Sequence, residues 1–301
     1  MPRLTAIVLG SAAGGGVPQW NCFCPVCRLA WEGDPRVKPR TQTGLAVSGE
    51  GTNWILLNAS PDLRAQIAAT PKLRPQAGPR ASPIAAVILS GAEIDQVSGL
   101  LHLREGQRFA LYGTPETLGI LGDNPVFEAL APEKVSRYPV RAGEAFSPSG
   151  GLEAELFLVP GKAPLYLEGD RPDIGTESGT NVGIEIRGNG GRLVFVPGAA
   201  RLTPLILERL KQADVLLFDG TLYQDNEMID VGVGNKTGRR MGHVPIEGAG
   251  GSLSALARLS GRRIYIHFNN TNRVLMEDSH ERRHVEAAGF EVAYDGMEIV
   301  L

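Results

Sequence analysis

Short apolar runs rich in β-branched residues recur from one end of the chain to the other, and this pattern constrains the fold most. Each run is four to six residues long and is bounded by Gly, Pro, Asn, Asp or Ser, as β-strands are. Several runs stay apolar at successive positions, which indicates strands that are covered on both faces. Clear examples are Thr5–Leu9, Trp54–Leu57, Ile84–Leu89, Leu156–Val159, Val182–Ile186, Leu193–Val196, Val215–Phe218 and Ile264–Phe268.

Helix signals alternate with these strands. The expected helices run from Pro61–Asp62 to about Ala69, from Asp95 or Gln96 to Arg104, from Pro204 to Leu210 behind a Thr203 cap, from Pro245 to about Leu259, and from a cap at Asp278 to Gly289. This order predicts an α/β (α+β) fold with helices outside packed sheets. The chain has 301 residues and no linker-like segment, so we expect a single domain, residues 1–301.

The charge pattern excludes some partners. Lys and Arg total 30 and Asp and Glu total 33, the two signs are mixed, and no basic block occurs, so nucleic acid is not an expected partner. No apolar run approaches the roughly 20 residues that span a bilayer. Leu4–Leu9 is better explained as a first strand than as a secretion signal. We therefore expect a soluble, cytoplasmic protein.

The three cysteines of the chain, Cys22, Cys24 and Cys27, lie within six residues. An odd number so tightly grouped argues against a disulfide framework and for a metal site. Tetrahedral zinc accepts three thiolates and one further ligand at about 2.0–2.3 Å. The fourth ligand is not local, and His102, Asn270 or another late group are the open choices. The sequence thus predicts structural zinc in a loop at about residues 20–28.

Ionisable residues follow several of the expected strands. They are Glu93 and Asp95 after the third run, Asp219 after the seventh, His243 just before an expected helix, and His267 within the eighth. Taken singly, each has a structural explanation, such as a helix cap, a turn residue or a hydrogen-bonded core histidine.

The set is more informative than its members. The chain has only five histidines, and two of them are in this group. If the strands are parallel neighbours or face each other across a sandwich, their ends share one edge. Two histidines with one to three carboxylates suit non-haem Fe(II), and also Mn(II) or Zn(II).

One motif competes with this interpretation. The run from His280 to His284 matches the H-E-x-x-H pattern of zinc proteases. Its two middle residues are Arg, and little chain follows to supply a third ligand. A capping box of Asp278 and Glu281 explains the segment better. The glycine-rich run Gly10–Gly16 fits neither nucleotide-binding pattern and is expected to be a loop.

These features together resemble the metallo-β-lactamase superfamily. In its strand-plus-H-x-H-x-D-H signature the histidine positions hold Gly91, Glu93 and Gln96 here, and only Asp95 is kept. Asp219 matches the bridging aspartate of the superfamily, and His243 and His267 match its two late histidine motifs. Within the superfamily, three features resemble a branch that acts in pyrroloquinoline quinone (PQQ) biosynthesis: the cysteine cluster and the segments Leu9–Cys22 and His267–Asn272.

The resemblance spans nearly the whole chain and implies a four-layer αββα sandwich with a metal site at one edge. It implies an iron-dependent, O₂-using hydroxylase of the tyrosine ring of a Glu–Tyr-derived PQQ precursor, with a carrier of PQQ or its precursor to the periplasm as the alternative. A mononuclear metallohydrolase is disfavoured by the missing histidines. The implied catalytic residues are Glu93, Asp95, Asp219, His243 and His267, of which the last four hold Fe(II).

The implied partners are a Glu–Tyr dipeptide or PQQ precursor and O₂, and a homodimer remains open. The polar segment Glu168–Asn181 is expected to cover the substrate.

Overall fold

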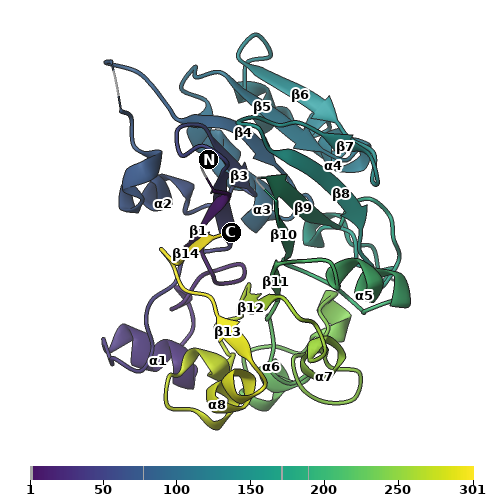
Figure 1. Cartoon of the computed structure of the whole chain (residues 1–301). Coiled ribbons are helices and arrows are strands. Elements are labelled where there is room, and N and C mark those ends of the chain that lie inside the picture. The colour runs from purple at the N-terminus through teal and green to yellow at the C-terminus, as the bar shows by residue number, and fades with distance from the viewer. Residues whose placement is uncertain (1–2, 77, 171, 189) are drawn as a thin grey trace.

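The computed structural model describes residues 3–76, 78–170, 172–188 and 190–301, so residue 171 of the expected covering loop lies outside the described residues. Its strands form two seven-stranded sheets (Figure 1). The first sheet contains, in spatial order, β14 (Glu298–Val300), β1 (Thr5–Gly10), β2 (Gly44–Ser48), β3 (Trp54–Leu57), β4 (Ile84–Ile88), β5 (Phe109–Gly113) and β6 (Val135–Pro139). The second contains β13 (Phe290–Val292), β12 (Arg262–Ile266), β11 (Val215–Asp219), β10 (Gly191–Val196), β9 (Val182–Gly188), β8 (Glu153–Leu158) and β7 (Ala145–Phe146).

Both sheets are mixed, and each has a parallel half. Strands β3 to β6 pair in parallel in the first sheet, and β10 to β13 do so in the second. The remaining neighbours pair antiparallel. The parallel halves matter for function because the carboxyl ends of parallel strands meet at one edge.

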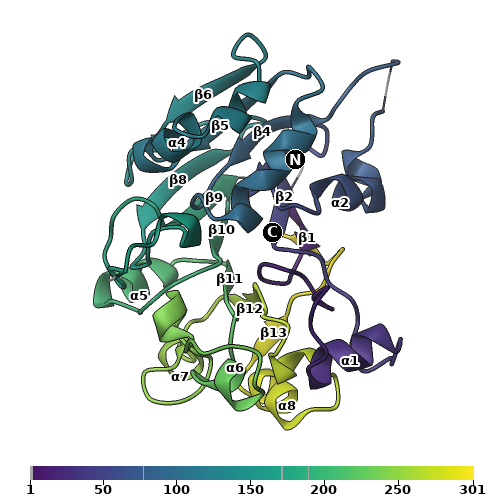
Figure 2. The same cartoon turned by 180° about the vertical axis from the view of Figure 1, so that it is seen from behind.

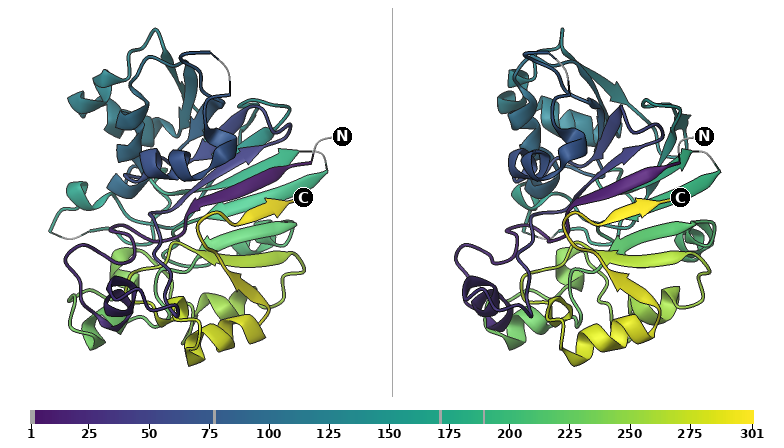
Figure 3. Two further views of the ribbon diagram at one scale, coloured as in Figure 1. Left: turned by 90° about the vertical axis from the view of Figure 1, so that its left-hand side faces the viewer. Right: turned by 60° about the vertical axis from the view of Figure 1, so that its left-hand side comes forward.

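The two sheets pack face to face over an apolar core. Side chains alternate along each strand, so one set of apolar residues points between the sheets and the other points outward. The inner cluster includes Val8, Leu57 and Ile88 of the first sheet with Ile184 and Phe195 of the second, all at most 1% exposed. The sandwich is seen along its sheets in Figure 3.

Helices cover the outer faces of both sheets, which Figure 2 shows from behind. Helices α2 (Leu63–Ala69), α3 (Ile94–Val97) and α4 (Pro115–Gly122) contribute to the apolar cluster on the first sheet. Helices α1 (Pro25–Trp31), α5 (Pro204–Leu210), α7 (Ser252–Leu256) and α8 (His280–Ala287) contribute to that on the second. The result is the expected αββα order of layers. The short helix α6 (Glu227–Asp230) follows β11.

Several expected helix boundaries differ from the structure. The segment after Pro245 is not helical, because the backbone N–H groups of Ile246 and Glu247 donate to Leu222 and Tyr223, and helix α7 begins only at Ser252. The expected run to Arg104 divides into α3 and a 3₁₀ segment, Ser98–Leu103.

The last helix has a different cap from the one predicted. Ser279, not Asp278, is its N-cap, and the Ser279 hydroxyl accepts a hydrogen bond from the backbone of Arg282. The prediction failed because Ser and Asp are both good caps and adjacent in sequence, so only backbone geometry distinguishes them.

Across the described residues, no helix is both long and apolar enough to cross a bilayer.

Candidate metal centres

Parallel pairing of β11 and β12 places two of the candidate residues side by side. Asp219, the last residue of β11, is in register with Ile266, the last residue of β12. His267 therefore follows at the same edge of the sheet. Its backbone has φ of 65°, in the left-handed region that side chains other than glycine seldom adopt. The chain thus turns sharply at His267 and keeps the imidazole at the strand end.

The opposite sheet supplies Asp95. After β4, the amide and hydroxyl of Ser90 are hydrogen-bonded to the side chain of Asn58, which fixes the start of the connecting turn. Glu93 then occupies the N-cap position of α3, and Asp95 lies in its first turn. Asp95 Oδ2 lies 3.2 Å from His267 Nε2. Asp95 is therefore not a helix cap: its carboxylate faces an imidazole from the other sheet.

His243 reaches the same place from a loop. Gly242 has φ of 87°, and this left-handed turn ends the preceding 3₁₀ segment and directs the next side chain inward. The His243 backbone N–H donates to the carbonyl of Gly238, and His243 Nδ1 lies 2.8 Å from Asp219 Oδ2. The imidazole rings of His243 and His267 stack with centroids 5.3 Å apart.

Thr221 contacts the same groups, although no local sequence signal marks it. Its hydroxyl donates to Asp219 Oδ1 at 2.6 Å and lies 3.1 Å from His243 Nδ1 and 2.8 Å from His267 Nδ1. Asp219 is fully buried and accepts further hydrogen bonds from the backbone N–H groups of Thr221 and Ala199. One donor atom from each of Asp219, His243 and His267 lies within 4.8 Å of the others.

Burial opposes charge in this cluster, but the groups compensate one another. Burial raises the pKa of Asp95 and of Asp219, yet the neighbouring imidazoles outweigh it and the pKa of both carboxyls is lowered. Burial likewise works against protonation of His267, but Asp95 outweighs it and raises the imidazole pKa. The carboxylates therefore favour positive charge here, as a metal-binding site requires.

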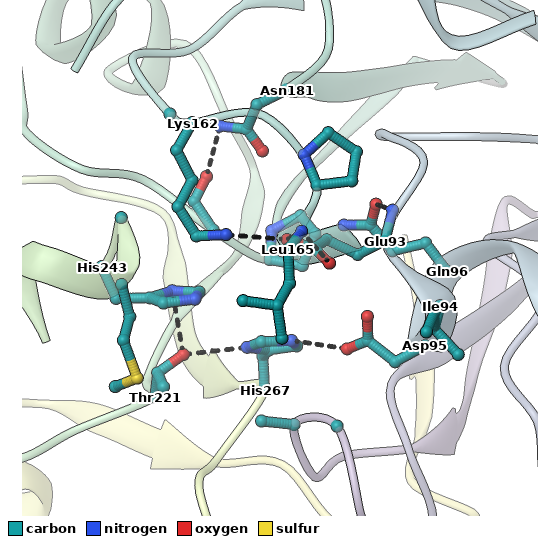
Figure 4. A pocket seen from close by; sticks show the side chains of 18 of the residues that line it. Glu93, Ile94, Asp95, Gln96, Lys162, Leu165, Asn181, Thr221, His243 and His267 are labelled. Atoms are coloured by element: carbon teal, nitrogen blue, oxygen red, sulfur yellow. Dashed lines mark hydrogen bonds and ion pairs between the residues drawn. The ribbon is translucent and has the colours of Figure 1, made fainter. Parts of the chain in front are cut away.

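A cavity of about 460 Å³ opens beside the cluster, and Figure 4 shows His243, His267, Thr221 and Asp95 facing it. Its rim has apolar side chains, including Ile94 and Leu165, each 57% exposed. Basic groups also line it, of which Lys236 is the most accessible. Other lining residues are Gly14, Gly15, Gln42, Pro164, Glu168, Thr180, Asn181, Met241 and Asn269. The cavity thus combines an apolar rim with a polar floor.

Glu93 lines the same cavity but lies outside the donor cluster. Its carboxylate pairs with Lys162 Nζ at 3.0 Å and accepts from the backbone N–H of Leu165. Lys162 also pairs with Glu168 at 2.7 Å. Glu93 therefore fastens the Lys162–Glu168 segment to α3. No local sequence signal marks Lys162, because its partners lie 69 positions before it and six after it.

The three cysteines converge as expected, with their sulfur atoms within 4.8 Å of one another. Pro25 begins α1, so Cys24 takes the N-cap position and Cys27 lies in the first turn. Asn270 contacts all three: its amide nitrogen lies 3.0 Å from Cys22 Sγ, 3.3 Å from Cys27 Sγ and 3.8 Å from Cys24 Sγ.

Of the two named choices for a fourth ligand, Asn270 is therefore adjacent to the thiols. His102 lies exposed in the 3₁₀ segment after α3 and is not part of the cluster. The backbone carbonyl oxygen of Asn270 lies 3.4 Å from Cys24 Sγ, so three sulfurs have one oxygen atom beside them, a number of donors that suits tetrahedral zinc.

The H-E-x-x-H segment forms neither centre. His280 and His284 lie on α8 with ring centroids 6.0 Å apart, and His284 Nδ1 lies 2.8 Å from the hydroxyl of Tyr223. In the part of the chain that the structure describes, neither histidine belongs to a group of three or more metal-capable side chains.

Comparison with known proteins agrees with this architecture. A family profile described as "Beta-lactamase superfamily domain" matches residues 53–268. "Coenzyme PQQ synthesis protein B" of Methylobacterium sp. (strain 4-46) is 56% identical, covering 99% of this chain and 100% of that protein, and its namesake in Methylobacterium nodulans is 55% identical with the same coverage. The crystal structure of Zn(2+)-bound PqqB from Methylobacterium extorquens superposes with a TM-score of 0.97 at 53% identity, over 99% of this chain and 100% of that one. The chain therefore has the metallo-β-lactamase fold and belongs to the coenzyme PQQ synthesis protein B family.

Proposed function

We propose that this chain acts in PQQ biosynthesis as an Fe(II)-dependent hydroxylase that uses O₂ to oxidise the tyrosine ring of a Glu–Tyr-derived precursor. The pathway follows from the name shared by its relatives, coenzyme PQQ synthesis protein B. The chemistry rests on one observation, that Asp219, His243 and His267 converge and that the two histidines line an open cavity. Two imidazoles and a carboxylate with open positions are the donor set of non-haem Fe(II) oxygenases.

We assign Asp95, Asp219, His243 and His267 to the iron centre. Fe(II) bound there supplies the one-electron chemistry that O₂ needs in order to react with an organic ring. The protein groups hold this set in place. Thr221 hydrogen-bonds Nδ1 of His267 and leaves Nε2 facing Asp95, and such outer partners fix the tautomer and orientation of an imidazole.

His243 has two candidate roles. It is 19% exposed at the cavity while its Nδ1 contacts buried Asp219, so it either completes the ligand set or moves a proton between substrate and carboxylate. Ring hydroxylation places one oxygen atom of O₂ on carbon and releases the other as water. Each turnover therefore takes up two electrons from a reductant and two protons, and His243 is the cavity group best placed to relay protons.

The cavity suits an aromatic, carboxylate-bearing substrate. Ile94, Pro164 and Leu165 provide an apolar surface at the rim for a ring, and Lys236 lies within the same lining for an acidic group. Preformed pockets of this composition are typical of small-molecule sites.

The residues at the superfamily histidine positions, Gly91, Glu93 and Gln96, disfavour hydrolysis. Gln96 Oε1 accepts from the backbone N–H of Glu93, and the Glu93 carboxylate is engaged with Lys162. Gly91 offers no side chain. A dinuclear hydrolase needs several histidines to hold two ions and a bridging hydroxide, and this cavity does not supply them.

We also propose that Cys22, Cys24 and Cys27 hold structural zinc, with an oxygen atom of Asn270 as the remaining donor, since its carbonyl lies beside Cys24 Sγ. The related crystal structure is described as Zn(2+)-bound, which supports zinc in this family. Thiolate-rich zinc has a closed coordination shell and stabilises the local fold.

The deciding experiment is anaerobic reconstitution with Fe(II), followed by O₂, a reductant and a Glu–Tyr dipeptide. We expect a product heavier by one oxygen atom, labelled from ¹⁸O₂, and at least a hundredfold lower rate for Asp219→Ala. No product, or an unchanged rate in that variant, refutes the hydroxylase. Tight binding of PQQ or its precursor without turnover would favour the carrier function instead.

A further inference from the structure

The two proposed metal centres are joined by a single short turn, His267–Asn272. His267 belongs to the imidazole–carboxylate centre, and Asn270, three residues later, lies among the cysteine sulfurs. No other pair of proposed ligands from different centres is so close in sequence. The geometry points to coupling: we infer that the thiolate centre, acting through Asn270, positions His267, so that an ion at one centre raises the affinity of the other.

The turn is tightly held along its length. The N–H of Phe268 donates to Ser11, that of Asn269 donates to Thr221, and the side chain of Asn272 donates to Gly220 at 2.8 Å. The bond to Ser11 ties the turn to the end of β1, and the bonds to Thr221 and Gly220 tie it to the β11 end that carries Asp219. Displacement of one end of so constrained a turn is therefore transmitted to the other rather than absorbed locally.

The conformation of His267 makes it sensitive to such displacement. Its positive φ is disfavoured for a residue with a side chain, and a conformation of this kind persists only where the surroundings enforce it. On one side it is enforced by β12. On the other it depends on the turn, in which Asn270 contacts the three cysteine sulfurs.

The thiol groups alone are a weaker anchor than a zinc-bound cluster. Cys24 donates its thiol hydrogen to the Asn270 carbonyl at 3.4 Å, and the Asn270 amide lies 3.0 Å from Cys22 Sγ. Zinc binding replaces these weak contacts with coordinate bonds and orders the ligands. Occupancy of the thiolate centre therefore reduces the conformational freedom that His267 loses when it binds its own ion, which is a basis for positive cooperativity.

The inference rests on the proposed metal centres but not on the hydroxylation reaction. It is tested by Co(II) titration of the full chain, monitored by absorption under anaerobic, reducing conditions. Thiolate-bound Co(II) gives an intense sulfur-to-metal charge-transfer band, whereas Co(II) bound by imidazole and carboxylate gives only weak ligand-field bands. The two centres are thus observed separately in one sample.

We expect Co(II) to bind the imidazole–carboxylate centre about tenfold more tightly when the thiolate centre holds Zn(II) than in a Cys24→Ser variant, whose thiolate centre is disabled. Asn270→Ala, which keeps the cysteines, should also weaken Co(II) binding at that centre. The matched control is Asn124→Ala, which removes an amide bonded to Ile120 remote from both centres and should change nothing.

Two further measurements keep the test decisive if Cys24→Ser fails to fold. In the unmodified chain, filling the imidazole–carboxylate centre must raise the affinity of the thiolate centre for Co(II), measured from the charge-transfer band, by the same factor, because coupling is reciprocal. Zinc at the thiolates should also slow hydrogen exchange of the Phe268 and Asn269 amides more than that of amides in β5. Affinities equal within twofold with the thiolate centre full or empty, or unchanged exchange in the turn, overturn the coupling, while the hydroxylation assay at saturating Fe(II) is unaffected.

Discussion

The hydroxyl of Thr221 is the smallest group on which the imidazole–carboxylate centre depends. The Thr221 hydroxyl contacts Asp219, His243 and His267 at once, and the residue is 3% exposed. A hydroxyl can donate one hydrogen bond and accept others, so it can satisfy a buried carboxylate and still orient two rings. Thr221 thus orients the two imidazole rings and hydrogen-bonds the Asp219 carboxylate at the same time.

Replacement of Thr221 by Val removes that hydroxyl while keeping the shape of the side chain. We expect about tenfold to a hundredfold weaker Fe(II) or Co(II) binding at this centre, the usual effect of losing an outer partner of metal ligands. Metal titration followed by absorption measures it, and Thr221→Ser, which keeps the hydroxyl, is the control. Equal affinity of the Val and Ser variants would show that the hydroxyl has no orienting role.

At the scale of elements, the Lys162–Glu168 segment is held over the cavity by charge. Lys162 is 11% exposed and Glu168 is 7% exposed, and burial of the Glu168 carboxyl is outweighed by Lys162 and further cations, which lower its pKa. Lys236 and Arg240 approach the same carboxylate at 4.0 and 3.4 Å. The segment is therefore fixed by a network rather than by one pair.

Lys162→Met leaves two carboxylates without their shared partner. We expect the free energy of unfolding to fall by about 2 kcal/mol, less than for an isolated buried pair because Lys236 and Arg240 remain. Chemical denaturation measures the change. Lys211→Met breaks a solvent-exposed pair with Glu208 and should alter stability by less than about 0.5 kcal/mol. A similar small effect for both variants would contradict the network.

Helix α6 carries a pH-sensitive group. Burial raises the pKa of Glu227 to about 7, although hydrogen bonds from Thr271 and from the backbone of Tyr223 lower it in part. Between the ordinary value of 4.5 and about 7 the folded chain therefore holds more protons than the unfolded chain. Its contribution to stability is present below that window and is lost as pH rises through it.

Glu227→Gln should remove this dependence. Relative to the unmodified chain, the variant should gain about 1–3 kcal/mol in free energy of unfolding between pH 4.5 and 7, with no further change above. Denaturation at several pH values measures the difference. If the difference between variant and parent stays constant across this pH range, Glu227 titrates normally in the folded chain.

At the scale of the whole molecule, the core between the sheets is separate from the metal centres. Phe195 is fully buried there. Phe195→Ala should lower the free energy of unfolding by about 3–5 kcal/mol through lost burial and a residual cavity. Metal content per folded chain, measured by atomic emission, should stay the same. A loss below about 1 kcal/mol, or loss of a metal with the fold intact, would contradict this separation.

What the sequence determined by itself was local. Runs bounded by turn residues predicted the strands, Thr203 with Pro204 predicted the start of α5, and three clustered cysteines predicted a thiol group in one place, because each signal lies within a few residues. The strand ends also yielded Asp95, Asp219, His243 and His267 as candidates.

Only the tertiary structure decided which candidates meet. His267 contacts Asp95 from 172 positions away, across two sheets, while Glu93, two residues from Asp95, faces Lys162 instead. No local signal marks Thr221 or Lys162, and only the structure distinguishes Asn270 from His102 as the residue beside the sulfurs. Contacts of this kind depend on strand pairing and sheet packing, which bring together side chains whose separation along the chain carries no information about their distance in space.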